Sequence, residues 1–365
     1  IVCQAHRAGG DWSSGAISRT NPIKTLEQKG VDSMRSVLIV GLALWVGLGI
    51  VPVGLAGLQP SDPLITEIIQ QVDEGRLREH ICQLQSREGG EYCNEYGSRW
   101  SCDASAIDRA TEYARQYFES LGLTTRLVPY SLSCRPGLSY NVEAELPGAE
   151  SSALVLITAH IDSLVGMNPF AMSSGQAAPG ADDNASGSAA VLEAARILSQ
   201  YKFKHTIRFV LFTGEEQWMV GSSAYAAEMA RTSAPILGVF NVDMIGYDSD
   251  DNGFFEIWVG TKSEEVFEGS SRLAELITKT IGIYELGLVP EVLDDPRRGG
   301  DQEPFWRRGY AAVMVIEDTE YGTTDDFNPG YHTAADVLRF LNLAYMKRMV
   351  QAVLGAAAQL AEPIQ

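Results

Sequence analysis

The chain has 365 residues, of which 28 are Lys or Arg and 47 are Asp or Glu, and its formal net charge at pH 7 is −19. Hydrophobic residues make up 45% and charged residues 21%, a globular composition that excludes wholesale disorder and fibrous repeats. The excess of carboxylates would repel nucleic acid and anionic membrane surfaces, so we expect neither as a partner, whereas metal ions are compatible with it.

A secretory signal peptide is predicted at residues 34–56. A short basic start is followed by an uncharged apolar run over residues 37–58, and small residues stand at Gly54 and Ala56, where a signal peptidase would cut. The alternative is an uncleaved membrane anchor formed by residues 37–58, because about 20 apolar residues can span a bilayer. Residues 1–33 are interpreted as an upstream extension or a disordered tail outside the fold.

Cysteine usage also fits an exported protein. Four of the five cysteines lie in one segment, residues 82–134. An even number of cysteines in an oxidising compartment predicts two disulfide bonds, for which three pairings are possible. A structural zinc site is the alternative, disfavoured because the segment has no Cys-x-x-Cys pair. The four residues are Cys82, Cys93, Cys102 and Cys134.

Helical and strand-like patterns alternate along the rest of the chain. Helices are predicted over residues 63–83, 103–121, 186–201, 222–231, 264–281 and 337–360. Strands are predicted over residues 124–130, 140–146, 153–159, 207–213, 236–242, 254–259 and 311–316. This alternation predicts an α/β fold, a single three-layer α/β/α domain over residues 60–365 with a mainly parallel, mixed sheet. The cysteine-rich segment would be an elaboration of that domain.

Histidine and carboxylate side chains gather where the predicted strands end. Because active residues of such sheets collect at the carboxyl ends of the strands, we expect these side chains to meet. Each of them alone is more often a helix cap, a packed histidine or a solvated pair. Crowded carboxylates need compensating cations, and mixed His and carboxylate ligands suit zinc. More carboxylates are present than one tetrahedral ion needs, which predicts two ions that share a ligand.

Five motifs carry these side chains, and their order resembles that of the co-catalytic zinc aminopeptidases, metallopeptidase family 28. The likeness runs from about residue 74 to the C-terminus and implies the fold of those enzymes. The motifs are His160-x-Asp162, Gly180-Ala-Asp-Asp183-Asn-Ala-Ser-Gly187, Gly214-Glu215-Glu216, Asn241-Val-Asp243-Met-Ile-Gly246 and Tyr331-His332-Thr333.

The resemblance implies a set of metal ligands. One zinc ion would be held by His160 and Asp243, and a second by Glu216 and His332. Asp183 would bridge the two ions. Manganese or cobalt could replace zinc, because this ligand set tolerates several divalent ions.

The resemblance also implies catalytic residues. Glu215 would be the general base for a water held between the two ions, and Tyr331 would donate to the oxyanion. Asp162 would hydrogen-bond the far ring nitrogen of His160 and thereby orient its ring. The peptide bond between Asp183 and Asn184 would be cis.

Two positions depart from the family pattern. Gln302 stands where relatives have a histidine, within Asp301-Gln302-Glu303-Pro304-Phe305-Trp306, and this affects substrate contacts rather than the metal site. Trp218-Met219 replaces a commoner small or apolar pair and reshapes the rim of the pocket. The apolar residues predicted to line the substrate pocket are Met244, Ile245 and Phe305.

These features predict a secreted dizinc aminopeptidase that removes N-terminal residues from peptides. Peptide substrates are the expected partners, and no specific protein partner is evident. A carboxypeptidase of the same family is disfavoured because the chain lacks the length for additional domains. A glutaminyl-peptide cyclotransferase of the family is a further candidate, and a catalytically inactive ectodomain used for binding is a candidate from a different class.

Overall fold

The computed structural model describes residues 61–87, 93, 96–294, 299–319 and 326–364, all within the unit Leu55–Gln365. The predicted upstream extension, the signal peptide and the alternative anchor over residues 37–58 lie outside the described residues. No helix in the described part of the chain combines the length and the apolar character needed to cross a bilayer.

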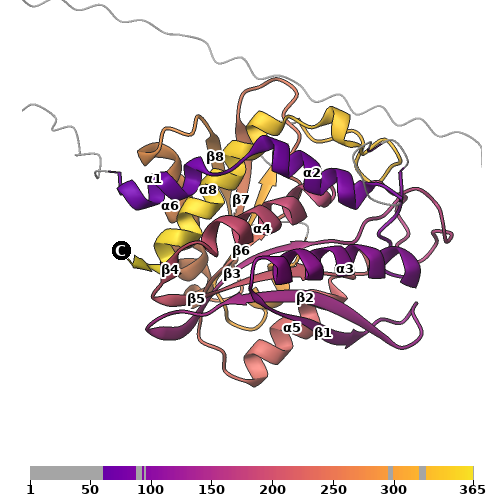
Figure 1. Ribbon diagram of the computed structural model, residues 1–365, viewed down its shortest axis with the longest axis horizontal. Coiled ribbons are helices and arrows are strands. Elements are labelled where there is room, and N and C mark those ends of the chain that lie inside the picture. Colours follow the sequence, from indigo (N-terminus) through magenta and orange to yellow (C-terminus); the bar gives the residue numbers. More distant parts are fainter. Residues whose placement is uncertain (1–60, 88–92, 94–95, 295–298, 320–325, 365) are drawn as a thin grey trace, which may run out of the picture. The chain divides into compact units, whose positions relative to one another are not determined.

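An eight-stranded mixed sheet forms the middle layer (Figure 1). Its spatial order is β1-β2-β5-β3-β6-β9-β7-β8. The pairs β5–β3, β3–β6, β6–β9 and β7–β8 are parallel, and the other neighbours are antiparallel. The strands are β1 (Thr124–Ser131), β2 (Leu138–Leu146), β3 (Ser151–His160), β5 (His205–Phe212), β6 (Ile236–Val242), β7 (Phe254–Val259), β8 (Val289–Leu293) and β9 (Ala312–Glu317).

Helices cover both faces of the sheet, as the alternating pattern predicts (Figure 1). Successive residues of a strand point to opposite faces, so Val155 and Ile157 join one apolar cluster and Leu154 and Leu156 join the other. The first cluster is covered by α1 (Pro63–Gln70), α2 (Glu74–Gln85), α3 (Ala104–Ser120), α4 (Ala185–Leu198), α6 (Glu264–Ile283) and α8 (Leu343–Ala361). The second is covered by α5 (Val220–Arg231) and the short α7 (Glu303–Trp306).

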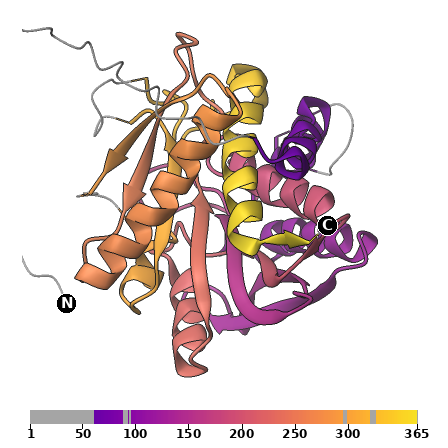
Figure 2. The same ribbon diagram turned by 90° about the vertical axis from the view of Figure 1, so that its left-hand side faces the viewer.

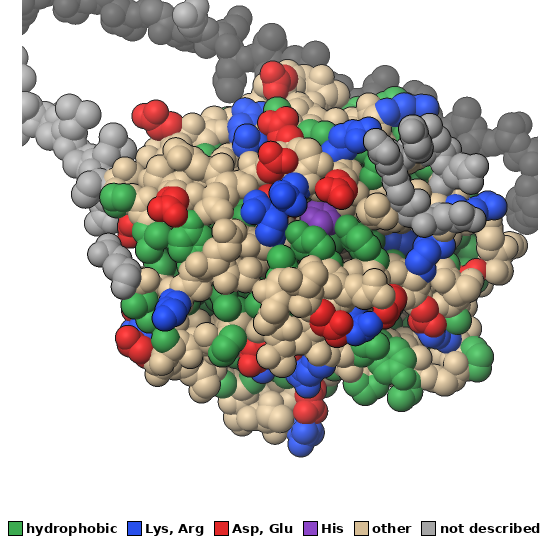
Figure 3. All heavy atoms as spheres, in the orientation of Figure 1, with side chains coloured by type: hydrophobic (Ala, Val, Ile, Leu, Met, Phe, Trp, Pro, Cys, Tyr) green, Lys and Arg blue, Asp and Glu red, His purple; other side chains and the backbone are tan. Residues whose placement is uncertain are grey.

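The C-terminal helix α8 closes the first face. It packs beside α6 and α1, and the strand β10 (Pro363–Ile364) that follows it pairs with β4 (Lys202–Phe203) (Figure 2). On the face shown in Figure 3, Lys and Arg side chains lie interspersed with Asp and Glu side chains.

Two predicted helices differ from the observed ones because polar side chains cap the backbone inside them. The helix predicted over residues 63–83 is two helices, since the Asp73 carboxylate accepts from the backbone N–H of Arg76 and starts α2 there. The helix predicted over residues 337–360 begins with a separate 3₁₀ turn, and Asn342 caps the start of α8. The short elements β4, β8, β10 and α7 are absent from the predicted elements.

The two predicted disulfide bonds are present. Cys82 of α2 pairs with Cys93, and Cys102 pairs with Cys134 of the connection between β1 and β2. The segment between the two bridges, residues 96–101, is largely buried against the carboxyl end of the sheet.

His80 supplies a stability prediction, because it is buried without its charge. Its Nδ1 lies 2.7 Å from the Tyr113 hydroxyl, and burial, together with Arg76 and Arg196, lowers its pKa to about 3. In the unfolded state His80 has a pKa near 6.5, so it takes up a proton at a higher pH there than in the folded protein. The contribution of neutral, buried His80 to the free energy of unfolding is therefore complete above pH 6.5 and is lost as the pH falls toward 3.

We therefore expect His80→Asn, which does not titrate, to flatten the pH dependence of unfolding. Between about pH 6 and pH 4 the wild-type free energy of unfolding should fall about 1.4 kcal/mol per pH unit more steeply than that of the variant. Urea titrations at several pH values measure this difference. Parallel curves would contradict it.

Candidate functional site

Three adjacent strands place the polar side chains of the site. β3 lies between β5 and β6, all three are parallel, and their carboxyl ends therefore meet at one edge. His160 is the last residue of β3, Glu215 and Glu216 follow β5, and Asp243 follows β6. Asp183 comes from the loop that leads into α4.

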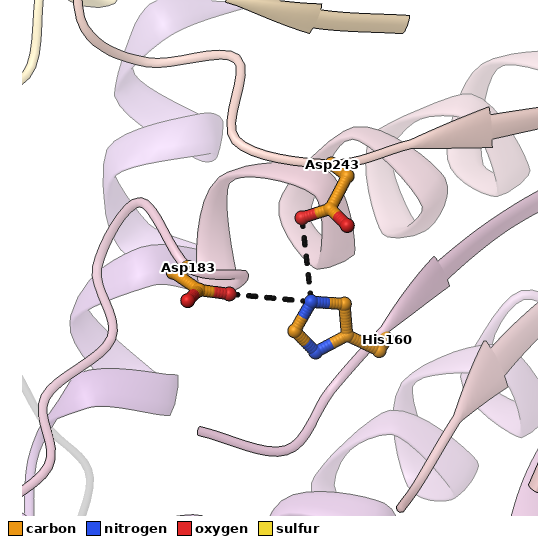
Figure 4. Close-up of side chains that lie close together, drawn as sticks. All are labelled: His160, Asp183 and Asp243. Atoms are coloured by element: carbon orange, nitrogen blue, oxygen red, sulfur yellow. Dashed lines mark hydrogen bonds and ion pairs between the residues drawn. The ribbon is translucent and has the colours of Figure 1, made fainter. Parts of the chain in front are cut away.

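The first donor group consists of His160, Asp183 and Asp243 (Figure 4). His160 Nε2 lies 3.2 Å from Asp183 Oδ1 and 3.3 Å from Asp243 Oδ1. All three residues are buried, and the two carboxylates approach the imidazole from different segments of the chain. One donor atom from each residue lies within 4.8 Å of the others, a spacing at which the three could hold one ion.

The second donor group shares Asp183 with the first. His332 Nε2 lies 3.2 Å from Asp183 Oδ2 and 3.1 Å from Glu216 Oε2. One carboxylate oxygen of Asp183 thus faces His160 and the other faces His332. The structure therefore brings together all five predicted ligands, arranged around the bridging position that was predicted for Asp183.

The loop that presents Asp183 is held from two sides. The Asp336 carboxylate accepts hydrogen bonds from the backbone N–H groups of Asp182 and Asp183, both at 2.9 Å. The Asn184 side chain donates to the carbonyl of Val242 at the end of β6, at 2.9 Å. The peptide bond between Asp183 and Asn184 is cis, as the family resemblance implies.

The buried carboxylates of the site favour the binding of a cation. Burial alone would lower the pKa of His332, but Asp183 and Glu216 raise it to about 10. Asp243 and other carboxylates likewise raise the pKa of His160 well above its ordinary value, although burial acts to lower it. Burial and the neighbouring Asp183 raise the pKa of Glu216 to about 7. The carboxylates of the site thus favour positive charge at the position between His160 and His332.

The donor chemistry fits divalent metal ions. Each group offers one imidazole and two carboxylates, which is the ligand mixture that zinc and similar ions accept. Glu216 Oε1 is buried and accepts no hydrogen bond from any described residue, which leaves a lone pair for a cation. Asp183 offers one oxygen to each group, as a bridging ligand must.

A cavity of about 320 Å³ opens onto both donor groups. Glu215 and Tyr331 line it together with the five ligands, and the ring of Tyr331 stacks on that of His332 at 3.9 Å between centroids. Burial and nearby carboxylates raise the pKa of Tyr331, so its hydroxyl keeps its proton at neutral pH. The apolar part of the wall consists of Met167, Met244, Trp258, Met314, Ile316 and Phe327.

The predicted pocket residues are only partly in this wall. Met244 lines the cavity, whereas Ile245 and Phe305 lie in the hydrophobic core. Ile245 packs in the cluster under α8, and Phe305 packs against aromatic rings of β5 and α5. Met314 and Ile316, two residues apart on β9, share a face and could have been inferred from strand alternation. Loop residues such as Met167 and Phe327 carry no periodic signal.

Asp162 lies beside His160 on the side away from the other carboxylates. His160 Nδ1 is 3.2 Å from the backbone carbonyl of Asp162 and 3.6 Å from its Oδ1. The hydrogen bond at the far ring nitrogen is therefore accepted by the backbone carbonyl of Asp162, and the predicted bond to its carboxylate is not formed, because 3.6 Å exceeds hydrogen-bond distance. The carboxylate accepts from the backbone N–H of Glu215, at 3.3 Å, and so connects the segment after β3 to the segment after β5.

Comparison with known proteins places this chain in a family. A family model described as "Peptidase family M28" matches residues 141–357. Leucine aminopeptidase 1 of the fungus Arthroderma gypseum is 32% identical over 234 residues, which cover 61% of this chain and 58% of that protein. The chain thus matches less than two thirds of the length of this relative.

Solved structures share the fold at lower identity. The LapA aminopeptidase of Legionella pneumophila superposes with a TM-score of 0.67 at 21% identity, covering 84% of this chain and 79% of that one. A glutaminyl cyclase from Fimbriiglobus ruber gives a TM-score of 0.60 at 17% identity, covering 78% and 94%. Because one fold occurs in both kinds of protein, the fold alone does not separate their reactions.

Proposed function

Because this chain belongs to peptidase family M28, whose model matches more than half of it, we propose that it is a zinc-dependent aminopeptidase. The proposal rests on one observation above all, the two His and carboxylate groups joined through Asp183 at the floor of a cavity that Glu215 also lines. The names of the relatives that match this chain agree with it.

The proposed ligand set follows the two donor groups. His160 and Asp243 would hold one zinc ion, Glu216 and His332 would hold a second, and Asp183 would contact both. When bound, the ions would polarise the scissile carbonyl and make a water molecule more acidic. Two nearby ions would also keep the buried carboxylates ionised, although burial raises the pKa of Glu216 and Asp243.

The remaining steps belong to side chains of the cavity wall. Glu215 takes the proton of the attacking water and returns it to the leaving amine, which is general base and then general acid catalysis. Tyr331 keeps its hydroxyl proton and donates to the oxyanion that develops on the substrate. Asp162 holds the ring of His160 in its orientation from the side of Nδ1.

The wall of the cavity supports a preference for apolar N-terminal residues. Its six apolar residues include three methionines from different segments of the chain and one tryptophan, and a cavity of about 320 Å³ has room for a leucine-sized side chain. The substrate class is therefore peptides with a free amino group and an apolar first residue. Two disulfide bonds support an oxidising, extracellular location.

A panel of aminoacyl chromogenic amides tests the proposal. We expect Leu and Met amides to be cleaved with kcat/KM at least tenfold above Asp and Lys amides, because a charged side chain would be buried unpaired in the apolar wall. Acetylation of the amino group should abolish cleavage. Prolonged dialysis against a chelator should reduce cleavage below detection, and added zinc should restore it.

Two outcomes of the same panel would reject the proposal. Cleavage that survives complete removal of metal, verified by elemental analysis, would contradict a metal-dependent hydrolase. Release of ammonia from a Gln-initiated peptide, with no free amino acid produced from any amide, would identify a cyclotransferase instead.

A further inference from the structure

The buried segment between the two disulfide bonds contacts the loops of the site. It contains Arg99 and Ser101, neither of which lines the cavity or belongs to the proposed ligands. Arg99 is 0% exposed and Ser101 1%. We propose that Arg99 is a positioning residue that fixes the separation of His160 and Asp183. Ser101 would be a second positioning residue, which fixes the backbone segment that carries Glu215 relative to Asp162. The inference builds on the proposed metal ligands.

Arg99 uses its guanidinium group to join separate stretches of backbone. Its Nε donates to the carbonyl of Ile161 at 2.7 Å, and its Nη2 donates to the carbonyl of Gly180 at 2.8 Å. Nη1 donates to the carbonyl of Pro179 at 2.6 Å and to that of Leu84 at 3.2 Å. Four of its five N–H donors thus hold carbonyl oxygens.

Two of these stretches carry proposed metal ligands. Ile161 directly follows His160, and Gly180 stands three residues before Asp183. The planar guanidinium therefore sets the distance between the chain segments of two side chains that must share one ion. The packing is close, because a Cβ added at Gly180 would lie 3.0 Å from Arg99 Nη2 and 2.2 Å from the carbonyl oxygen of Asp183.

The partners of Arg99 distinguish it from an ordinary buried ion pair. Its four guanidinium hydrogen bonds go to backbone carbonyl groups, whereas the carboxylates of Asp336, Asp183 and Asp162 act on it through their charge alone. Burial lowers its pKa only to about 10, so it stays charged at neutral pH. Burying a cation costs free energy, and carbonyl groups compensate for it less fully than a carboxylate would. Arg99 makes this costly arrangement with the loops around the site and with the end of α2, which favours a role in positioning those loops.

Ser101 makes a second connection, to the segment after β5. Its Oγ donates to Asp162 Oδ2 at 3.0 Å and accepts from the backbone N–H of Gly214 at 2.9 Å. Asp162 Oδ1 in turn accepts from the N–H of Glu215. Ser101 therefore fixes both the carboxylate beside His160 and the backbone that presents the proposed base.

Three single variants test this role. Arg99→Lys keeps the charge but not the planar fork, Ser101→Ala removes one oxygen, and Ser98→Ala is the matched control. The Ser98 hydroxyl lies in the same buried segment and accepts from the N–H of Trp100, two residues along the same segment. Zinc affinity of the metal-free proteins is measured by competition with a chromophoric chelator, together with the absorption spectrum of the cobalt-substituted forms.

We expect Arg99→Lys to bind zinc about 10- to 100-fold more weakly, because outer partners of metal ligands have effects of this size. Its cobalt spectrum should be altered, and at saturating metal kcat should fall while KM stays within about twofold. Ser101→Ala should lower kcat about tenfold at unchanged KM, since it acts on the backbone of Glu215. Ser98→Ala should match wild type in every measurement.

The inference fails if Arg99→Lys, folded by circular dichroism, shows wild-type zinc affinity and an unchanged cobalt spectrum. If that variant does not fold, Arg99→Gln, which keeps a single N–H₂ group for the carbonyl oxygens, takes its place in the same measurements. Wild-type kcat in Ser101→Ala would overturn the role of Ser101. A wild-type protein that binds no zinc would contradict the proposed function instead, so the two failures are distinguishable.

Discussion

Glu215→Gln should lower kcat by about 10²- to 10⁴-fold while zinc remains bound. The amide keeps the size of the side chain but cannot take a proton from water, which removes general base catalysis and little else. Glu215 lines the cavity but belongs to neither donor group, so the ligand set stays complete. Steady-state kinetics on a leucyl amide and elemental analysis of the same preparation measure the two parts of the prediction.

A control removes an unrelated carboxylate. Glu228 pairs with Arg231 on the exposed side of α5, and Glu228→Gln should leave kcat within about twofold of wild type. If the Glu215 variant loses its zinc, the side chain is a ligand and not the proposed base. If it keeps both its zinc and its activity, the proton must go elsewhere.

Asp183→Asn should be the most damaging substitution at the metal groups. Each oxygen of Asp183 faces a different histidine, so an amide would remove the shared negative charge from both groups at once. We expect zinc content to fall at both sites and kcat to fall at least 10³-fold. Titration of the metal-free variant with zinc measures how many ions bind and how tightly.

Two matched variants separate a bridging ligand from an ordinary one. Asp243 approaches His160, and Glu216 approaches His332. Asp243→Asn and Glu216→Gln should therefore each weaken one ion about 10- to 100-fold and leave the second ion bound. A variant of Asp183 that loses a single ion, like these two, would show that the carboxylate does not bridge.

The edge of the sheet that carries the proposed site could be predicted from sequence because its signals are local. His160 ends an apolar strand that is easily recognised, Glu216 and Asp243 each follow another, and parallel strands bring their ends together. The placement of His332 depended on the family motif, since His332 stands well beyond the end of β9 in the sequence. The mainly parallel character of the sheet followed from the alternation of strands and helices, although the order of the strands did not.

The features that could not be predicted depend on contacts with backbone atoms. Arg99 reads as one basic residue in a cysteine-rich loop, and its four carbonyl partners have no signature in the sequence. The helix break at Asp73 depends on a single cap, which competes with an otherwise continuous apolar pattern. Ile245 and Phe305 stand beside motif residues, but neighbours in sequence can face the core while the motif faces the cavity.

The cysteine-rich segment determines where a fragment that contains the whole proposed site must begin. The family model starts at residue 141, within β2, and every proposed ligand lies after that point. A recombinant fragment cut there would retain all the proposed metal ligands yet lose α1 to α3, β1 and the Arg99 guanidinium that we propose spaces two of these ligands. The shortest fragment suited to engineering is therefore about eighty residues longer at its N-terminal side than the family boundary suggests, beginning near α1.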